Sequence, residues 1–141
     1  MHYYVRDAGI YEGLQPEIVI RPGSPEEISR IFRVANLARM PIIVRGGGSN
    51  YAGAGISLEG GGILLETTRL NSVVEVDEES NSVTVQGGAN WGMLNYELKK
   101  LGLQTGMKGP ASGLTATIGG ALLWVARCGV RPSRDPSVTK Y

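Results

Sequence analysis

The amino-acid sequence predicts an α/β (α+β) fold, with short helices flanking a small mixed sheet. Short apolar runs at 42–44 and 63–65 are typical of buried strands. A capped amphipathic helix precedes the first run, and alternating apolar residues at 74–85 indicate a hairpin. The 141 residues are enough to bury one modest core.

The first half of the chain predicts a strand, a helix and a second strand. Residues 17–21 form the first strand, which ends at Pro22 and Gly23. The helix starts at Ser24, with Pro25 in its first position and Glu27 closing a capping box. It ends near Arg39, because Pro41 disfavours a helical residue before it. Its apolar face consists of Ile28, Ile31, Phe32 and Ala35.

The second half predicts a strand, a hairpin and a helix. After the strand at 63–65, Val74 and Val76 alternate with polar residues, as do Val83 and Val85, and 77–81 turn between them. This pattern predicts a hairpin with one face buried, on which these valines lie. Asn90 then caps a helix that Gly102 terminates. That helix carries Trp91, Leu94, Leu98 and Leu101 on one side, with Lys99 and Lys100 at its negative end.

A glycine-rich loop at 45–53 follows the strand at 42–44 and is the strongest functional signal. Consecutive glycines let backbone N–H groups point into one concavity, which suits a diphosphate. The run matches neither a P-loop nor the dinucleotide fingerprint G-x-G-x-x-G. The alternative is a flexible surface loop, which usually scatters Ser, Asp and Lys among its glycines.

Four side chains of this loop are candidates for ligand contact, each with an alternative. Ser49 and Asn50 suit phosphate oxygens, through both their amides and their side chains. Arg45 could steer a diphosphate, or it could be a solvated or structural charge. Tyr51 could touch a ligand or pack beneath the loop. Trp91 and Trp124 are expected in the core or an interface.

Composition excludes several classes of function. A net charge of +1 gives no electrostatic case for nucleic acid or an anionic membrane. A single cysteine, Cys128, fits a reducing compartment. The N-terminus lacks a signal pattern, and the apolar window 115–126 is too short to span a bilayer. We therefore expect a cytoplasmic protein without a transmembrane segment.

Three separated stretches carry a resemblance to a known family. They are residues 4–22, the loop at 45–53, and Gly-Pro-Ala-Ser-Gly at 109–113 followed by Thr-Ala-Thr-Ile-Gly-Gly-Ala at 115–121. Their order and spacing resemble the FAD-binding domain of the vanillyl-alcohol-oxidase and para-cresol-methylhydroxylase type. The glycolate-oxidase and D-lactate-dehydrogenase branch is the most similar, and the resemblance covers nearly all of residues 3–123.

The resemblance implies an FAD site in two parts. The loop would fold around the diphosphate, and 109–120 would run along the flavin and open a helix, although 110–112 alone could equally be an ordinary turn. The implied cofactor-binding residues are Arg45, Gly46, Gly47, Gly48, Ser49, Asn50, Tyr51, Gly53, Pro110, Ala111, Ser112, Thr115, Gly119 and Gly120.

Two departures from the family pattern bear on the cofactor. Several branches attach FAD covalently through a histidine just after the loop glycines, where this chain has Ser49. The only histidine is His2, and Cys128 lies in no attachment motif, so we expect non-covalent FAD. After Gly120 relatives tend to have Asn and Gly, whereas this chain has the apolar run 122–126.

By this resemblance, the chain would contain the first FAD-binding subdomain and only the start of the second. We expect an N-terminal FAD-binding part at 1–126 and a tail at 127–141 that is disordered or completed by a partner chain. No catalytic residues are predicted. A second polypeptide would supply the rest of the FAD domain and the cap domain, and the isolated chain would be inactive. The pair would oxidise a small 2-hydroxy acid of the glycolate or lactate type.

Two alternatives stay open from the sequence. The chain could be a non-catalytic remnant that persists as an assembly subunit of a flavoprotein, or it could be a piece of a longer protein. The altered segment after Gly120 favours the remnant, whereas the intact glycine loop argues against it.

Overall fold

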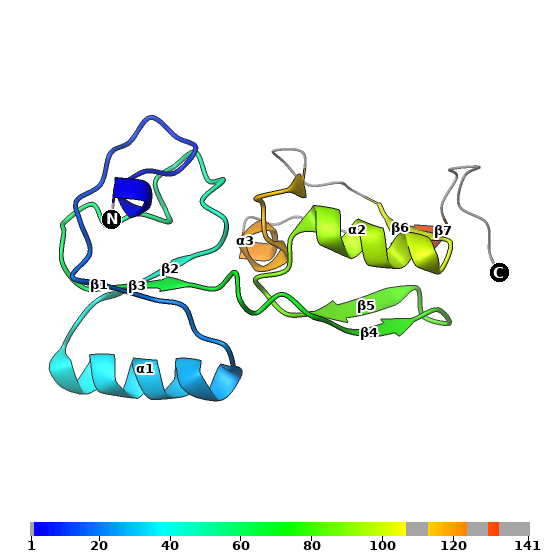
Figure 1. The fold of residues 1–141 in the computed structure, drawn as a ribbon, viewed down its shortest axis with the longest axis horizontal. Coiled ribbons are helices and arrows are strands. Elements are labelled where there is room, and N and C mark those ends of the chain that lie inside the picture. Colours follow the sequence, from blue (N-terminus) through cyan, green and yellow to red (C-terminus); the bar gives the residue numbers. More distant parts are fainter. Residues whose placement is uncertain (1, 107–112, 124–129, 133–141) are drawn as a thin grey trace. The chain divides into compact units, whose positions relative to one another are not determined.

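The computed structural model of the 141-residue chain describes residues 2–106, 113–123 and 130–132. The chain divides into two compact units, Met1–Leu70 and Asn71–Tyr141 (Figure 1). The predicted α/β class is confirmed. The described strands form three small sheets, one parallel and two antiparallel. Parallel and antiparallel pairing therefore occur in different sheets and not within one mixed sheet. The predicted boundary at 126/127 falls inside the second unit and stays a prediction.

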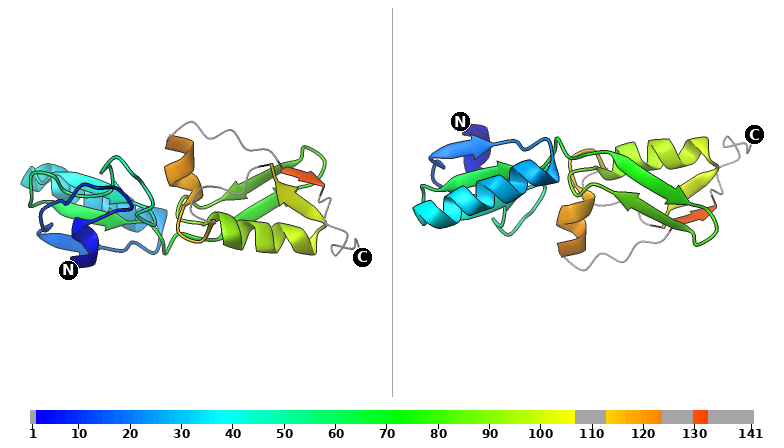
Figure 2. Two further views of the ribbon diagram at one scale, coloured as in Figure 1. Left: turned by 90° about the horizontal axis from the view of Figure 1, so that it is seen from above. Right: turned by 90° about the horizontal axis from the view of Figure 1, so that it is seen from below.

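The first unit is built on a three-stranded parallel sheet. After a short 3-10 helix, η1 (His2–Val5), the chain forms β1 (Ile18–Ile20), α1 (Pro25–Ala38), β2 (Ile42–Arg45) and β3 (Ile63–Glu66). The strand order is β1-β3-β2, and every residue of the central strand is buried. Helix α1 lies along one face of the sheet, and the glycine loop and N-terminal segment lie over the other (Figures 1 and 2).

Helix α1 begins and ends as the sequence predicts, with two differences in detail. The Ser24 hydroxyl accepts a hydrogen bond from the Glu27 N–H at 3.2 Å. The Glu27 carboxylate bonds the N–H of Gly23, one residue before the expected partner, at 2.6 Å. The helix stops because Arg39 adopts a left-handed conformation, with φ 52°. Phe32, predicted on the apolar face, is half exposed.

The second unit starts with the predicted hairpin, β4 (Val73–Asp77) paired antiparallel with β5 (Ser82–Val85). A register shift between Val73 and Glu75 marks a bulge, so the expected alternation fails there. Val73 and Val76 are half-buried, whereas Val74 is exposed. The prediction that Val74 lies on the buried face is therefore wrong, because the bulge turns its side chain outward.

The core of the second unit forms around α2 (Trp91–Lys100). The Asn90 side chain accepts from the Met93 N–H at 2.8 Å, which confirms the predicted cap. Trp91 and Leu98 are fully buried, and α3 (Ile118–Leu123) adds Ile118 to the same cluster. Leu101, predicted on the buried face, is 40% exposed because the helix ends before it.

Part of the predicted tail forms a strand with the second unit. Strand β7 (Val130–Pro132) pairs antiparallel with β6 (Leu103–Thr105). The expectation that 127–141 is disordered or completed by another chain stays a prediction, although these three residues pair with the chain's own β6. The other residues of the tail, and Trp124, lie outside the described residues.

Candidate functional site

The predicted diphosphate loop begins at the carboxyl end of β2, the edge at which ligands bind many open parallel sheets. Two glycines give the loop its path with left-handed backbone conformations, Gly48 at φ 69° and Gly53 at φ 77°. The Asn50 side-chain oxygen accepts from the Ala52 N–H at 2.6 Å and from the Ala54 N–H at 3.4 Å. Its side-chain oxygen therefore shapes the loop, which leaves its NH2 group to donate to a ligand.

The N-terminal segment holds the loop from one side. The Ala8 N–H donates to the Gly48 carbonyl at 3.0 Å, and the Leu14 N–H donates to the Ser57 carbonyl at 2.7 Å. A Cβ at Gly9 would overlap the carbonyl of Tyr51. Backbone contacts from the N-terminal segment therefore hold the middle of the loop, at Gly48 and Tyr51, and the segment that follows it, at Ser57.

Gly46 and Gly47 differ from the other loop glycines. Neither has a positive φ, and among the described residues no atom presses against the position of a Cβ at either site. The N–H groups of Gly47, Gly48, Ser49 and Asn50 have no acceptor within the described part of the chain. A compact group could therefore approach this stretch of backbone closely.

Arg45 is buried beneath the loop, with 3% of its surface exposed. Its Nη1 donates to the Gly55 carbonyl at 3.0 Å and its Nη2 to the Arg6 carbonyl at 2.9 Å. Its guanidinium also lies 5.2 Å from the ring centre of Tyr3. Two alternatives were given for Arg45. The bonds to Gly55 and Arg6 are those of a structural charge, and contact with a ligand stays a prediction.

Glu66, a residue the sequence analysis missed, ends β3 beside Arg45 in the sheet register. Its buried carboxylate accepts from the Tyr4 hydroxyl at 2.7 Å and from the Thr68 hydroxyl, and pairs with Arg21 at 3.3 Å. The available signal was that Arg45 and Glu66 each directly follow a predicted strand, at 42–44 and at 63–65.

These contacts set the ionisation of Glu66. Burial is the largest influence and raises the pKa of its carboxyl. The hydrogen bonds from Thr68 and Tyr4 and two nearby guanidinium charges outweigh burial and leave the pKa below its ordinary value. The hydrogen bond to Glu66 is the main reason that the pKa of Tyr4 is raised. Glu66 is thus an anion that anchors the N-terminal segment to the sheet.

The remaining loop candidates are placed as follows. Ser49 and Asn50 are half-buried. Tyr51 is 66% exposed, so the alternative that it packs beneath the loop is wrong, and ligand contact stays a prediction. Gly53 is buried, and a Cβ there would make only ordinary contacts with Tyr11. The reason for glycine at this position is therefore its positive φ and not a lack of space.

The flavin-side candidates belong to the second unit. The Gly119 N–H donates to the Gly87 carbonyl at 2.9 Å, and the Gly120 N–H bonds the Thr117 hydroxyl at 3.3 Å. Thr115 and Gly120 are exposed. Pro110, Ala111 and Ser112 lie outside the described residues. The glycine loop belongs to the first unit, so joint action of the loop and this segment stays a prediction.

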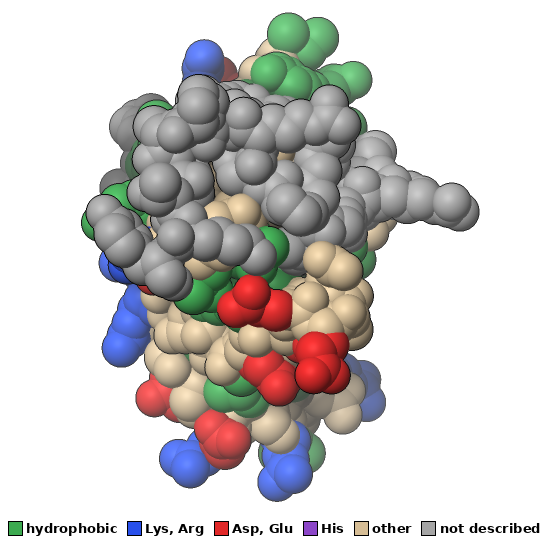
Figure 3. All heavy atoms as spheres, turned by 90° about the vertical axis from the view of Figure 1, so that its right-hand side faces the viewer, with side chains coloured by type: hydrophobic (Ala, Val, Ile, Leu, Met, Phe, Trp, Pro, Cys, Tyr) green, Lys and Arg blue, Asp and Glu red, His purple; other side chains and the backbone are tan. Residues whose placement is uncertain are grey.

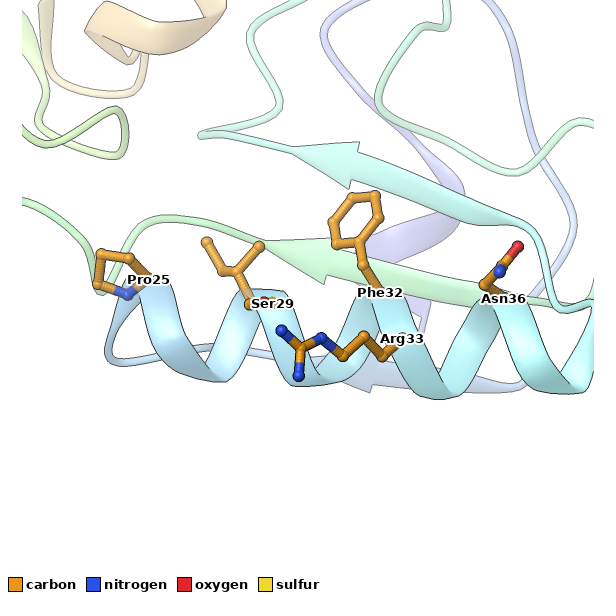
Figure 4. Close-up of a pocket in the computed structure, with 6 residues that line it drawn as sticks. Pro25, Ser29, Phe32, Arg33 and Asn36 are labelled. Carbon is orange, nitrogen blue, oxygen red and sulfur yellow. The ribbon is translucent and has the colours of Figure 1, made fainter.

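A surface hollow elsewhere in the first unit contains none of the predicted site residues. It runs along one side of α1 and is lined by Pro25, Ile28, Ser29, Phe32, Arg33 and Asn36 (Figure 4). The described residues contain no group of three or more His, Cys, Asp or Glu that could hold a metal. Within those residues, no helix is long and apolar enough to cross a membrane. Both acidic and basic side chains appear on the face in Figure 3.

Comparison with known proteins identifies the class. The family model for the FAD binding domain matches residues 16–129, and the chain belongs to this family of FAD-linked oxidoreductases of the vanillyl-alcohol-oxidase and para-cresol-methylhydroxylase type. Among individual proteins, it is 40% identical over 85 residues to glycolate oxidase subunit GlcD of Bacillus subtilis (strain 168). It is 31% identical over 126 residues to a D-lactate dehydrogenase of Archaeoglobus fulgidus.

The similarity covers much of this chain but little of each relative. The match to the glycolate oxidase subunit spans 60% of this chain and 18% of that protein, and the match to the D-lactate dehydrogenase spans 88% and 27%. The chain thus spans well under a third of the length of these relatives.

Solved structures agree with the family assignment. Glucooligosaccharide oxidase from Acremonium strictum, which carries a 6-S-cysteinyl, 8α-N1-histidyl FAD, is 29% identical with a TM-score of 0.70. That likeness covers 84% of this chain and 24% of the oxidase. Alkyldihydroxyacetonephosphate synthase is 33% identical with a TM-score of 0.67, over 74% of this chain and 21% of the synthase.

Proposed function

We propose that this chain binds the diphosphate of a non-covalent FAD on the backbone amides of Gly46–Asn50, and that 109–120 borders the flavin. The observation that carries the proposal concerns Gly46 and Gly47. Neither the φ of these residues nor contact with described atoms requires glycine there. Close approach of a ligand to the backbone does require it. The fixed path of the loop supports this, because a preformed site binds without an ordering cost.

Non-covalent attachment is supported by the residue after the loop glycines. Position 49 is a serine, which cannot form the histidyl bond expected in several branches of the family. The Ser49 hydroxyl can instead donate a hydrogen bond to a phosphate oxygen. The chain would hold FAD by hydrogen bonds and dipoles alone.

We propose further that the chain acts as part of an oxidoreductase that oxidises a 2-hydroxy acid. The similarity to a glycolate oxidase subunit and to D-lactate dehydrogenases supports this substrate class. Oxidising such a substrate needs a base for its hydroxyl proton and cations for its carboxylate. The bound FAD would accept the hydride. The loop at 45–53 contains one charged side chain, the buried Arg45, so those groups must come from elsewhere.

A companion polypeptide is the source that we propose for those groups. It would carry the rest of the FAD domain and a cap domain, which fits the 18–27% of each relative that the chain matches. Exposed apolar residues of α3 offer part of an interface, with Leu122 at 58% and Leu123 at 81% exposure.

The test is the visible absorption spectrum of the chain, purified alone and after co-expression with the product of the adjacent gene. We expect flavin absorption in the co-purifying complex, and oxidation of lactate or glycolate by that complex but not by the chain alone. Flavin in the chain alone would support FAD binding but would contradict the idea that binding requires the companion polypeptide. Flavin in neither sample would overturn the proposed function.

A second candidate is an assembly subunit that no longer turns over substrate. It is favoured by the apolar run after Gly120, where Leu122 and Leu123 are exposed. A complex that holds the chain but neither binds FAD nor oxidises 2-hydroxy acids would support it.

A further inference from the structure

Arg45 is a buried cation that no carboxylate contacts within the described residues. Its Nη atoms bond two backbone carbonyls, of Gly55 and Arg6, and its Nε has no partner among the described residues. Glu66 is the neighbouring acid, but its carboxylate is already engaged by Tyr4, Thr68 and Arg21. Buried charges in proteins are normally paired. The charge of Arg45 helps to lower the pKa of the Glu66 carboxyl, but no described carboxylate lies in direct contact with the Arg45 guanidinium.

The guanidinium of Arg45 lies directly beneath the backbone of the glycine loop. A Cβ at Gly48 would overlap Nη2 and would lie 2.7 Å from Cζ. The guanidinium therefore packs directly against the loop backbone at Gly48. Below, the guanidinium faces the rings of Tyr3 and Tyr4, at 5.2 and 5.9 Å from their centres.

We infer that Arg45 is a positioning residue whose charge favours the diphosphate through the loop without touching it. The anion would add a second counter-charge to that of Glu66, which Arg45 does not contact directly. At the same time the bonds to Gly55 and Arg6 tie the start of the loop to its return and to the N-terminal segment. Because Arg45 is buried, with 3% of its surface exposed, its field is screened less than that of a surface arginine. This inference rests on the proposed FAD site.

The test compares FAD with riboflavin, which shares the flavin but lacks the diphosphate. Dissociation constants of both are measured by fluorescence titration of the flavin-binding form, whether the full chain alone or its co-purified complex. The variants are Arg45→Met, Arg45→Gln and Arg45→Lys. The control is Arg69→Met, since Arg69 also donates to a backbone carbonyl, that of Arg21 at 2.8 Å, but is exposed.

We expect the wild type and Arg69→Met to prefer FAD over riboflavin to the same extent. Both neutral variants should reduce that preference about tenfold or more, with riboflavin affinity little changed. Arg45→Lys, which retains the charge, should stay within about threefold of the wild type. Should Arg45→Met fail to fold, Arg45→Gln and Arg45→Lys make the same comparison.

Two outcomes overturn the inference alone. In one, the neutral variants keep the wild-type preference for FAD. In the other, all three variants lose both flavins in equal proportion, as a purely structural residue would cause. A wild type that binds neither flavin overturns the proposed function, and this inference with it.

Discussion

The backbone N–H of Gly119 donates to the carbonyl oxygen of Gly87 at 2.9 Å, and a Cβ at position 119 would lie 2.7 Å from that same oxygen. The start of α3 is thus held against the segment that leads into α2. Gly119 is a predicted flavin-side residue, yet the chain's own packing already requires glycine there. This contrasts with Gly46 and Gly47, where no described contact does.

Gly119→Ala should destabilise the chain by about 1–3 kcal/mol, because the obstructing atoms are backbone and cannot rotate away. Gly92→Ala is the matched control. A Cβ at Gly92 would meet its nearest atom, the Gly113 carbonyl oxygen, at 3.4 Å, and alanine in a helix is favoured by about 0.5–1 kcal/mol. Urea unfolding followed by circular dichroism measures both. Equal stability of the two variants would contradict the close approach.

Gly47→Ala should separate binding from folding. With no described atom in its way and no positive φ, alanine at 47 should leave the free energy of unfolding within about 0.5 kcal/mol of the wild type. FAD affinity should fall about tenfold or more, because the methyl group occupies the approach to the backbone.

Gly48→Ala is the comparison for Gly47→Ala. It should lower stability by about 1–3 kcal/mol, since Gly48 has a φ of 69° and Arg45 fills the space of a Cβ. Thermal unfolding and FAD titration measure the two effects. Unchanged FAD affinity in a folded Gly47→Ala chain would argue against the diphosphate lying there.

Glu66 should make the first unit sensitive to acid. Its carboxyl has a lower pKa in the folded chain than its ordinary value, so the unfolded state takes up a proton more readily. The contribution of Glu66 to stability is therefore present above about pH 4.3, the ordinary value, and is lost as the pH falls through the lowered one.

Glu66→Gln tests this pH dependence. At neutral pH the variant should be less stable than the wild type by about 1–3 kcal/mol. Between about pH 5 and pH 3, on either side of the ordinary pKa, it should lose less stability than the wild type does. Glu26 and Asp77 also have lowered pKa values, but they remain in both proteins and cancel in the difference. Parallel unfolding curves at all pH values would contradict the role of Glu66.

Flavin bound to this chain should leave it on acid precipitation. With Ser49 where several branches have a histidine, no covalent bond is expected at that position. The measurement is the absorption of the supernatant and of the redissolved pellet. Flavin retained in the pellet would show covalent attachment and contradict this expectation.

Local signals predicted most of the elements. Ser24 and Asn90 both cap the expected helices, because their side-chain oxygens bond nearby N–H groups irrespective of distant structure. The alternation at 83–85 also predicted its strand. The outward turn of Val74 escaped prediction because a bulge changes the register without changing composition.

Long-range contacts decided what the sequence could not predict. Arg45 has an ordinary position at a strand end, and its burial depends on the carbonyls of Arg6 and Gly55, which approach it from other segments. Strand β7 lacks apolar periodicity and forms by pairing with β6, 25 to 29 positions away along the register. The loop was predicted from its composition. Which of its glycines are required by packing depends on contacts in the folded chain, such as the one between Gly48 and the buried Arg45 side chain.

The central claim is that the amides of Gly46–Asn50 bind the diphosphate of FAD. It is tested most directly by the amide spectrum of a 15N-glycine-labelled chain, in its flavin-binding form, titrated with FAD and with riboflavin. We predict that the signals of Gly46, Gly47 and Gly48 shift with FAD and not with riboflavin, while those of Gly60–Gly62 in the same unit stay in place. Unmoved Gly46–Gly48 signals at saturating FAD would contradict the account.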